Sequence, residues 1–378
     1  MIIPTNQIIV NKPKLIALST PKIYQNFNPQ SAKSLPSLSL YQNMTPIIQR
    51  TRPIINTPVF TTQPIRQNIT LLNNNSLPRL NLNKASFHAY PLNSNIEPAE
   101  KINILEYKIL NEIGQGVFGK IYRVIWSLNN KMYALKQETL DNMQDLVKRE
   151  NYVQILRNFL RTTNCQGVVC IYGNYYVQKG NQILYYELME LCERDFEKEI
   201  KERSRFLRYY SEMELISIFS QLVSTLAALQ RNNITHRDIK PQNILVANGR
   251  YKLCDFGEVR IMEKAEGITV QRVRGSELYM SPILFNGYRQ GINQVRHNTY
   301  RSDVFSLGMC FLFAATLSFN GLVEIREVID SNRKLAILNK HLGGRYSPRI
   351  INIINFMLQT DEQNRPDFLS LEMFINKK

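Results

Sequence analysis

The chain has 378 residues, of which 44% are hydrophobic, and it carries a formal net charge of +16 at pH 7. This length accommodates one large domain or two modest ones, and the basic balance favours acidic partners such as nucleic acid, an anionic membrane surface, an acidic protein or nucleotide phosphates. Five dispersed cysteines without a CxxC pair argue against a disulfide framework and against a zinc site. The longest apolar run of the C-terminal half, Met309 to Leu317, is too short to cross a bilayer, and residues 1–6 lack the features of a secretory signal. We therefore expect a soluble intracellular protein, in the cytoplasm or nucleus, with no membrane span.

Residues 1–100 differ in composition from the rest of the chain. They hold twelve of the sixteen prolines, no glycine, nine Lys or Arg residues and only two acidic residues. Prolines at this density interrupt helices and sheet ladders, so we expect residues 1–104 to form a disordered basic extension. A functional alternative is a docking arm, because Lys12 and Lys14 precede spaced apolar residues that could fill a partner's groove. A transit peptide is a further alternative.

From about Ile104 the pattern changes to short strands, which are followed by helices. Runs of β-branched and aromatic residues predict strands over residues 107–113, 120–125, 131–136, 167–177 and 182–190. Helical spacing appears over residues 141–160, 212–230, 303–317 and 349–358. Strands first and helices afterwards predict an α+β chain with two lobes.

A GxGxxG pattern, Gly114 to Gly119, lies in the turn between the first two predicted strands. Glycines allow the backbone to approach a polyphosphate closely, although this pattern alone is weak evidence. A dinucleotide-binding fold needs the pattern between a strand and a helix, so its place between two strands disfavours that fold.

Lys136 closes the predicted strand that follows the glycine-rich hairpin. A lysine at a strand end is usually solvated, but here it is suited to neutralising nucleotide phosphates. It would then need a carboxylate to hold it in place. Glu150 on the following helix is the best candidate, and spacing alone does not exclude Glu138.

The most specific signal is the segment His236-Arg237-Asp238-Ile239-Lys240-Pro241-Gln242-Asn243, which Asp255-Phe256-Gly257 follows. Asp238 can orient a hydroxyl group and accept its proton. Asn243 and Asp255 offer the oxygen ligands that Mg²⁺ prefers, and Lys240 supplies positive charge for a transferring phosphoryl group. Either tripeptide could occur by chance, but both at this spacing, after Gly114 and Lys136, indicate phosphoryl-transfer chemistry.

On these motifs, residues 106–375 resemble a protein kinase catalytic domain. The resemblance implies a bilobal fold over residues 105–376, with a small antiparallel β-rich N-lobe containing one main helix (about 105–190) and a larger helical C-lobe (about 193–376). It implies ATP and Mg²⁺ as the bound groups, with Asn243 and Asp255 as metal ligands.

The resemblance also implies the roles of individual residues. The catalytic set would be Asp238, Lys240, Asn243, Lys136 and its partner Glu150. The nucleotide-binding set would be Gly114, Gly116, Gly119, Ile121, Ala134, Lys136, Met189, Glu190, Cys192, Leu245 and Asp255. Phe256 would join His236 in an apolar column between the lobes, and Asp303 would brace the catalytic loop.

Substrate class follows from the same resemblance. Lys240, two residues after Asp238, is typical of serine/threonine kinases, and Ser276 could bridge Asp238 and Lys240. We therefore expect transfer of the γ-phosphoryl group of ATP to Ser or Thr of protein substrates. A pseudokinase scaffold is the alternative, although its usual mark is loss of one of the four central residues. A nucleic-acid binder is disfavoured, because no recognition helix, zinc finger or aromatic RNA-binding strand accompanies the basic charge.

Four departures from the family pattern raise further expectations. Ile283 replaces the glutamate that normally pairs with the arginine matched by Arg365, so that buried pair cannot form in its usual way, and another carboxylate or a looser segment would follow. Gln154 stands where an apolar residue is usual, which indicates a shifted register or a weakened column. Thr269 is a candidate activating phosphosite, with Arg237 as receptor, and phosphorylation-independent activity is the alternative. Residues 286–301 form a longer, basic connection, either a solvated loop or a feature that selects acidic substrates.

Overall fold

The structure is a computed structural model that describes residues 86–89, 102–116, 119–263, 267–326 and 328–376. Most of the predicted extension, including Lys12 and Lys14, therefore lies outside the described residues. Within it, Ser86–Ala89 forms strand β1, which pairs with strand β5, and Ile102 is buried in the core of the sheet. Ser86–Ala89 and Ile102 thus contact the domain, and disorder in the remainder of residues 1–104 stays a prediction.

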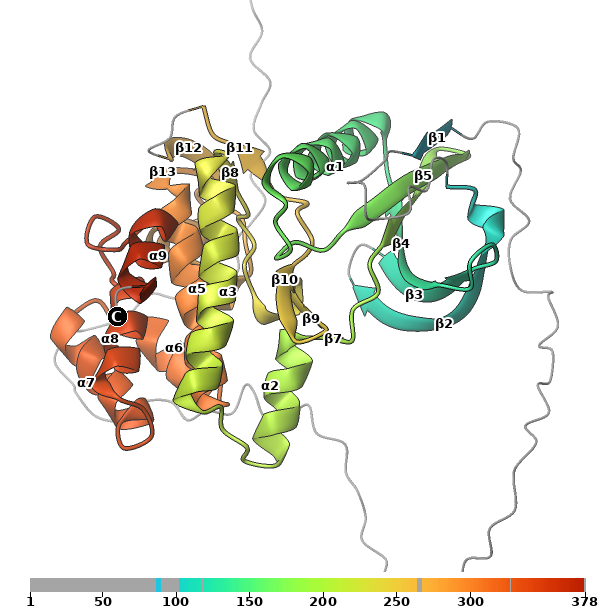
Figure 1. The fold of residues 1–378 in the computed structure, drawn as a ribbon. Coiled ribbons are helices and arrows are strands. Elements are labelled where there is room, and N and C mark those ends of the chain that lie inside the picture. Colours follow the sequence, from blue (N-terminus) through green and yellow to red (C-terminus); the bar gives the residue numbers. More distant parts are fainter. Residues whose placement is uncertain (1–85, 90–101, 117–118, 264–266, 327, 377–378) are drawn as a thin grey trace, which may run out of the picture. The chain divides into compact units, whose positions relative to one another are not determined.

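Six strands form one sheet in the order β1-β5-β6-β4-β3-β2, and every pairing in it is antiparallel (Figure 1). Besides β1, the strands are β2 (Tyr107–Gly116), β3 (Gly119–Trp126), β4 (Met132–Leu140), β5 (Ile171–Lys179) and β6 (Gln182–Met189). Val124, Leu135, Tyr175 and Leu188 are almost fully buried and form part of the core of this sheet. The predicted β-rich N-lobe is confirmed.

One long helix, α1 (Met143–Thr163), accompanies this sheet (Figure 1). Asn142 caps it by accepting a hydrogen bond from the backbone N–H of Asp145, and Asn164 ends it in the left-handed conformation. Val153 is 2% exposed, whereas the neighbouring Gln154 is exposed. The polar residue noted in the sequence therefore lies on the exposed side of α1, next to the buried Val153.

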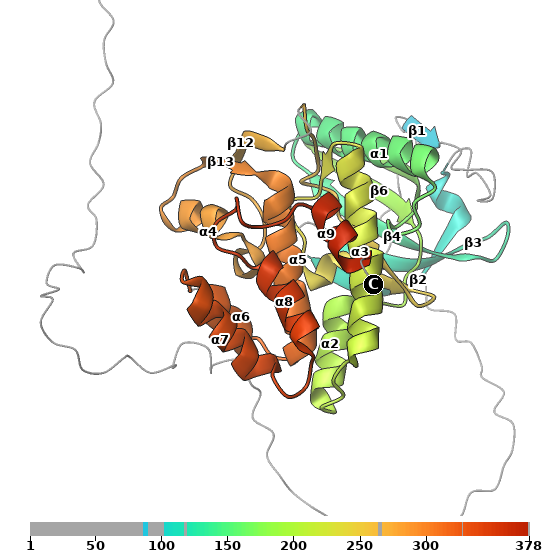
Figure 2. The same ribbon diagram turned by 60° about the vertical axis from the view of Figure 1, so that its left-hand side comes forward.

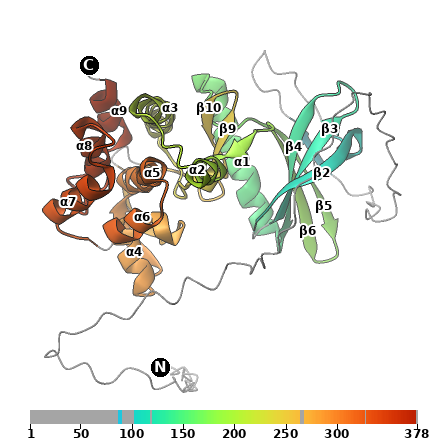
Figure 3. The same cartoon turned by 90° about the horizontal axis from the view of Figure 1, so that it is seen from below.

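The remaining elements form a helical lobe, which Figures 2 and 3 show from two further directions. Its helices are α2 (Phe196–Arg205), α3 (Glu212–Arg231), α4 (Pro282–Arg289), α5 (Thr299–Thr316), α6 (Asn320–Arg326), α7 (Ser331–Leu342), α8 (Pro348–Met357) and α9 (Phe368–Asn376). Helix α5 is apolar on nearly all sides and is buried over almost its whole length, because α3, α6, α8 and α9 pack around it. The lobe thus has a central helix that can brace the loops resting on it.

Short strands in this lobe carry the loops that matter for function. They are β7 (Arg194–Asp195), β8 (Ile234–Thr235), β9 (Ile244–Ala247), β10 (Arg250–Leu253), β11 (Arg260–Ile261), β12 (Ile268–Arg272) and β13 (Gln294–Asn298). Strand β13 pairs antiparallel with β12 over five residues. The connection over residues 286–301 is therefore not a simple solvated loop, because its second half forms a strand against the segment that follows Gly257.

Helix α3 is long and apolar enough to cross a membrane by length and composition alone. Half of the relevant window is buried inside the domain, and its residues Leu215, Leu222 and Leu226 belong to the main core. A core helix passes the same test, so this helix is weak evidence for a span.

Candidate active site

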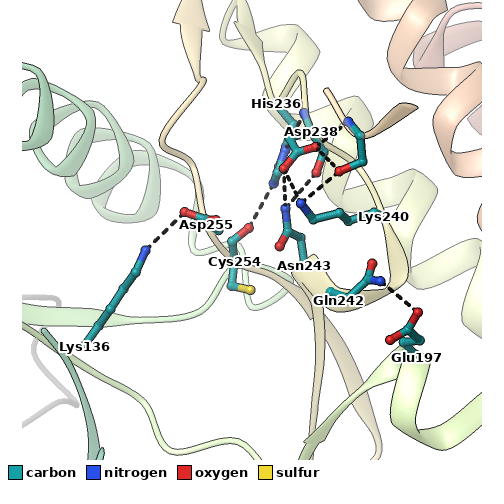
Figure 4. A network of polar contacts seen from close by, with 10 residues as sticks. Lys136, Glu197, His236, Asp238, Lys240, Gln242, Asn243, Cys254 and Asp255 are labelled. Atoms are coloured by element: carbon teal, nitrogen blue, oxygen red, sulfur yellow. Dashed lines mark hydrogen bonds and ion pairs between the residues drawn. The ribbon is translucent and has the colours of Figure 1, made fainter. Parts of the chain in front are cut away.

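The loop between β8 and β9 brings the predicted catalytic residues together (Figure 4). Asp238 Oδ2 accepts hydrogen bonds from Nζ of Lys240 (2.8 Å) and from Nδ2 of Asn243 (3.1 Å). Its Oδ1 accepts from the backbone N–H and the hydroxyl of Ser276, both at 3.1 Å, and Lys240 also donates to that hydroxyl over 3.0 Å. The predicted bridge through Ser276 is confirmed, and both oxygens of Asp238 are held in a fixed orientation.

Asp303 on helix α5 holds the backbone of this loop in place. Its carboxylate accepts the backbone N–H groups of His236 (2.9 Å) and Arg237 (3.0 Å), as the resemblance implied. Burial raises the pKa of Asp303 to about 7, while these N–H donors and the charge of Arg237 favour the ionised form. Two N–H groups aimed at one carboxylate fix the backbone next to Asp238.

The ring of His236 lies against Phe256, with 4.6 Å between the ring centroids. Its Nε2 is 3.1 Å from the carbonyl oxygen of Cys254, and its Nδ1 accepts the backbone N–H of Asp238 over 3.3 Å. These partners require a neutral ring with the proton on Nε2, and burial lowers the pKa of His236 accordingly. The predicted contact between His236 and Phe256 is confirmed, and it ties Asp238 to the Asp-Phe-Gly segment.

Lys136 reaches this segment from strand β4 (Figure 4). Its Nζ lies 3.2 Å from Oδ1 of Asp255 and 2.9 Å from Oε1 of Glu138. Glu138, which the spacing did not exclude, is thus an acid that pairs with Lys136, and a role of Glu150 in holding this lysine stays a prediction. Two residues along one strand lie on the same face, which keeps the groups of Lys136 and Glu138 adjacent.

Asn243 and Asp255 provide oxygen ligands that fit Mg²⁺. The amide nitrogen of Asn243 donates to the backbone oxygen of Asp238 at 2.8 Å, which leaves the amide oxygen as the outward acceptor (Figure 4). Asp255 has a side chain that is 39% exposed, and Lys136 and Arg149 hold its pKa below the usual range although burial opposes this. An ionised carboxylate and an amide oxygen are ligands of the type that this cation prefers.

The predicted adenine-binding residues lie on β4, β6 and β9 and on the segment that follows β6. Ala134 pairs directly with Met189 in the sheet, and Leu245 in β9 is half-buried. After Met189 the backbone N–H of Glu190 donates to the carbonyl oxygen of Cys170 (2.9 Å). The carboxylate of Glu190 pairs with Lys252 at 2.6 Å, so this connecting segment, which continues to Cys192, is fixed to the helical lobe.

The glycine-rich hairpin places Gly114 opposite Ile121 and Gly116 opposite Gly119. A Cβ at Gly119 would lie 1.8 Å from the backbone oxygen of Gln137, so glycine is required there for the close approach of β3 to β4. A Cβ at Gly116 would meet no atom within 4 Å. The structural need for glycine therefore differs between the two positions, and the open side lies at Gly116.

The side chain of Arg237 holds the backbone of the segment that follows Gly257. Arg237 donates to the carbonyl oxygens of Arg272 (3.0 Å) and Glu258 (3.3 Å). Thr269 lies within β12, opposite His297 of β13, and its role as a phosphosite remains a prediction. These contacts link Arg237 to both ends of the segment, at Glu258 and Arg272.

Arg365 has hydrogen-bond partners other than the glutamate that is missing at position 283, and the sequence did not indicate them. This guanidinium is 1% exposed and donates to the backbone oxygens of Gln359 (2.9 Å), Arg301 (2.9 Å) and Thr360 (3.1 Å). Burial lowers its pKa to about 10, and the nearby charge of Glu362 opposes this shift. Three carbonyls thus satisfy the buried cation, so Ile283 does not leave it unpaired.

Comparisons with known proteins agree with this geometry. Residues 107–374, more than two thirds of the chain, match the protein kinase domain family. The probable serine/threonine-protein kinase nek3 of Dictyostelium discoideum is 30% identical over 286 residues, which cover 72% of this chain and 24% of that protein. The probable serine/threonine-protein kinase nek2 of the same organism is 28% identical over 276 residues, covering 69% of this chain and 60% of that protein. The serine/threonine-protein kinase Nek6 of Oryza sativa subsp. japonica is 25% identical, over 69% of this chain and 46% of that protein.

The chain therefore belongs to the protein kinase family, with the bilobal fold of that family. Its similar curated relatives are kinases of the serine/threonine type. The chain spans less than two thirds of the length of these relatives.

Three residues near Lys136 were not predicted from the sequence, namely Arg149, Tyr152 and Glu187. Glu187 of β6 is 3% exposed and accepts a hydrogen bond from the hydroxyl of Tyr152 on α1. Burial raises the pKa of Glu187, while Lys136 and this hydroxyl oppose the shift. An acidic residue inside the otherwise apolar predicted strand 182–190 was the available signal, because a buried acid needs a partner.

Proposed function

We propose that this chain is an ATP- and Mg²⁺-dependent serine/threonine protein kinase. The observation that carries the proposal is the convergence of Asp238, Asn243, Asp255 and Lys136 from three separate segments of the chain. The serine/threonine preference is supported by the bridge from Lys240 through Ser276 to Asp238.

In the proposed reaction Asp238 orients a substrate hydroxyl and accepts its proton while the hydroxyl oxygen attacks the γ-phosphorus of ATP. The bond from that phosphorus to the bridging oxygen breaks, which gives a phosphoester and ADP, and Asp238 later releases the proton to solvent. Lys240 offsets the negative charge that develops on the transferring group, and Lys136 holds the nucleotide phosphates. When bound by Asn243 and Asp255, Mg²⁺ would neutralise phosphate charge.

The first test is phosphate transfer from labelled ATP to a peptide library, with autophosphorylation followed in parallel. Asp238→Ala should lower the rate at least about a thousandfold, because it removes the proton acceptor and much of the substrate orientation. Asp238 accepts hydrogen bonds from Lys240, Asn243 and Ser276, so the thermal unfolding temperature of the variant is measured in parallel to confirm that the loss of transfer occurs in a folded protein.

The outcome that would remove the proposal is transfer by Asp238→Ala at the rate of the unchanged chain. A chain that binds ATP but transfers nothing under any condition would instead be a pseudokinase scaffold. An intracellular location and a docking partner for residues 1–104 remain separate proposals, each supported only by composition.

A further inference from the structure

The ammonium group of Lys136 is held by a carboxylate from its own strand. Glu138 stands two residues further along β4, so both side chains leave the same face of the strand. Glu138 Oε1 lies 2.9 Å from Nζ of Lys136, and the Glu138 side chain is 2% exposed. A carboxylate buried to this extent must be compensated by charge, so the contact differs from an incidental surface pair.

Arg149 joins the same carboxylate from helix α1. Its Nε lies 2.9 Å from Oε2 of Glu138, and its Nη2 donates to Oε1 over 3.1 Å. Such two-point contacts between arginine and a carboxylate fix both partners more firmly than a single contact does. Glu138 therefore bridges one cation on the sheet and one cation on the helix.

The helical phase of α1 explains why Arg149 occupies this place. Arg149 lies three residues after Leu146 and four before Val153, which are both buried, so it belongs to the face of α1 that packs into the domain. Val153 is 2% exposed, whereas Gln154 is exposed and bonds to Asn158. The face that packs into the domain thus presents an arginine to the site.

Arg149 also lies against the Asp-Phe-Gly segment. A Cβ at Gly257 would stand 2.6 Å from Nη1 of Arg149, so the glycine leaves room for the guanidinium. Burial alone would lower the pKa of Lys136, but Asp255, Glu138 and Glu187 hold it above its ordinary value. The lysine is therefore kept charged by acids that all come from strands or loops.

We propose that Glu138 and Arg149 are the positioning residues for Lys136. Glu138 orients the ammonium group toward the nucleotide phosphates, and Arg149 ties that carboxylate to helix α1. The acid is thus supplied by the strand and the helix supplies a cation, which reverses the charge order that the resemblance implied for Glu150. The inference rests on the proposed function, because it assumes that Lys136 contacts the phosphates of ATP.

The test compares the dissociation constants of ATP and of adenosine, measured by calorimetry in EDTA on the full chain. Adenosine lacks phosphates, so a misplaced Lys136 should weaken ATP binding and leave adenosine binding unchanged. Glu138→Gln should raise the dissociation constant of ATP about tenfold, the size expected for losing a charge-assisted contact. Glu138→Asp should recover part of the loss. The matched control is Glu202→Gln, which removes the exposed ion pair between Glu202 of α2 and Arg194.

Arg149 is tested by a double-substitution cycle. Arg149→Gln should raise the ATP dissociation constant about threefold, and Arg149→Lys should raise it less. Adding Arg149→Gln to Glu138→Gln should cause no further loss, because both residues act through one bridge.

Each outcome separates this inference from the proposed function. If Lys136→Met leaves ATP binding unchanged, the role of Lys136 itself is wrong. If Lys136→Met weakens ATP binding but Glu138→Gln does not, or if Glu150→Gln weakens it more than Glu138→Gln does, the inference alone is overturned. An equal loss of ATP and adenosine binding in Glu138→Gln would show a merely structural role and would also overturn it.

Discussion

The two halves of the active site follow their family pattern to different degrees. In the helical lobe, Ser276 contacts Asp238 and Asp303 holds the backbone of the loop, both as predicted. In the β-rich lobe, Lys136 contacts Asp255 and takes its second acid from its own strand. The catalytic loop takes its partners from its own residues, from Ser276 and from helix α5, whereas the lysine takes one acid from its own strand, and Arg149 of helix α1 holds that acid. The two halves therefore differ in how far the holding groups can be predicted from the motifs.

The largest effect on stability is expected at Asp303, and it tests whether this carboxylate anchors the helical half of the site. Asp303→Ala leaves the backbone N–H groups of His236 and Arg237 buried without their acceptor. Each such loss costs about 1–3 kcal/mol, so the free energy of unfolding should fall by about 2–6 kcal/mol. Urea unfolding and the transfer assay measure the two consequences, and activity should fall with the order of the loop.

Asp303→Asn serves as the graded control, since an amide keeps one acceptor oxygen. Its loss of stability should lie between the unchanged chain and Asp303→Ala. Equal stability of all three proteins would mean that the helical half of the site is not anchored through this carboxylate.

The motifs of the site and the order of the two lobes could be predicted from the sequence for a physical reason. Asp238, Asn243 and Asp255 lie in short loops whose chemistry depends on residue type and spacing. The acid that pairs with Lys136 could not be chosen from the sequence, because the spacing allowed both Glu138 and Glu150, and the role of Glu150 stays a prediction. The strand within residues 286–301 could not be predicted, because the alternation in Gln294–Asn298 is too short to indicate a strand without its partner β12. The partners of Arg365 could not be predicted, because backbone carbonyls, which every residue carries, leave no mark in a sequence.

The next effect in size concerns β13 and tests whether the helical half depends on it. His297 is 2% exposed, its Nδ1 lies 2.8 Å from the hydroxyl of Ser302, and burial together with Arg237 and Arg365 lowers its pKa to about 4. Its ordinary pKa is 6.5, so the folded state disfavours the proton and the stabilising contribution is complete above pH 6.5. That contribution should decline as the pH falls toward 4, with a total loss of about 3 kcal/mol at 1.36 kcal/mol per unit.

Urea unfolding between pH 4 and 8 measures this dependence, with His297→Gln as the comparison. Other groups also titrate in this range, so the quantity of interest is the difference between the two proteins. A constant difference across the whole range would contradict the prediction.

A smaller effect is expected in the β-rich half at Tyr152. Tyr152→Phe removes the hydroxyl that donates to the buried carboxylate of Glu187, which should cost about 1–3 kcal/mol of unfolding free energy. Adding Glu187→Leu should recover part of this loss, because an apolar pair needs no hydrogen bond. If the double variant were less stable than Tyr152→Phe by the full cost of a core substitution, Glu187 would matter mainly through Lys136.

The smallest effect is expected at Ser276, where the helical half has redundant contacts. Ser276→Ala removes the hydroxyl that links Asp238 and Lys240, but the backbone N–H of residue 276 still donates to Oδ1 of Asp238. Two hydrogen bonds are lost, but Lys240 keeps its direct contact with Asp238, so a net cost of about 1 kcal/mol should lower the transfer rate about fivefold and leave the KM for ATP unchanged. Ser276→Thr keeps the hydroxyl and should retain most of the activity. A fall in the transfer rate as large as that of Asp238→Ala would show that the hydroxyl takes part in the chemical step. The contacts in the helical half would then be no more redundant than those around Lys136.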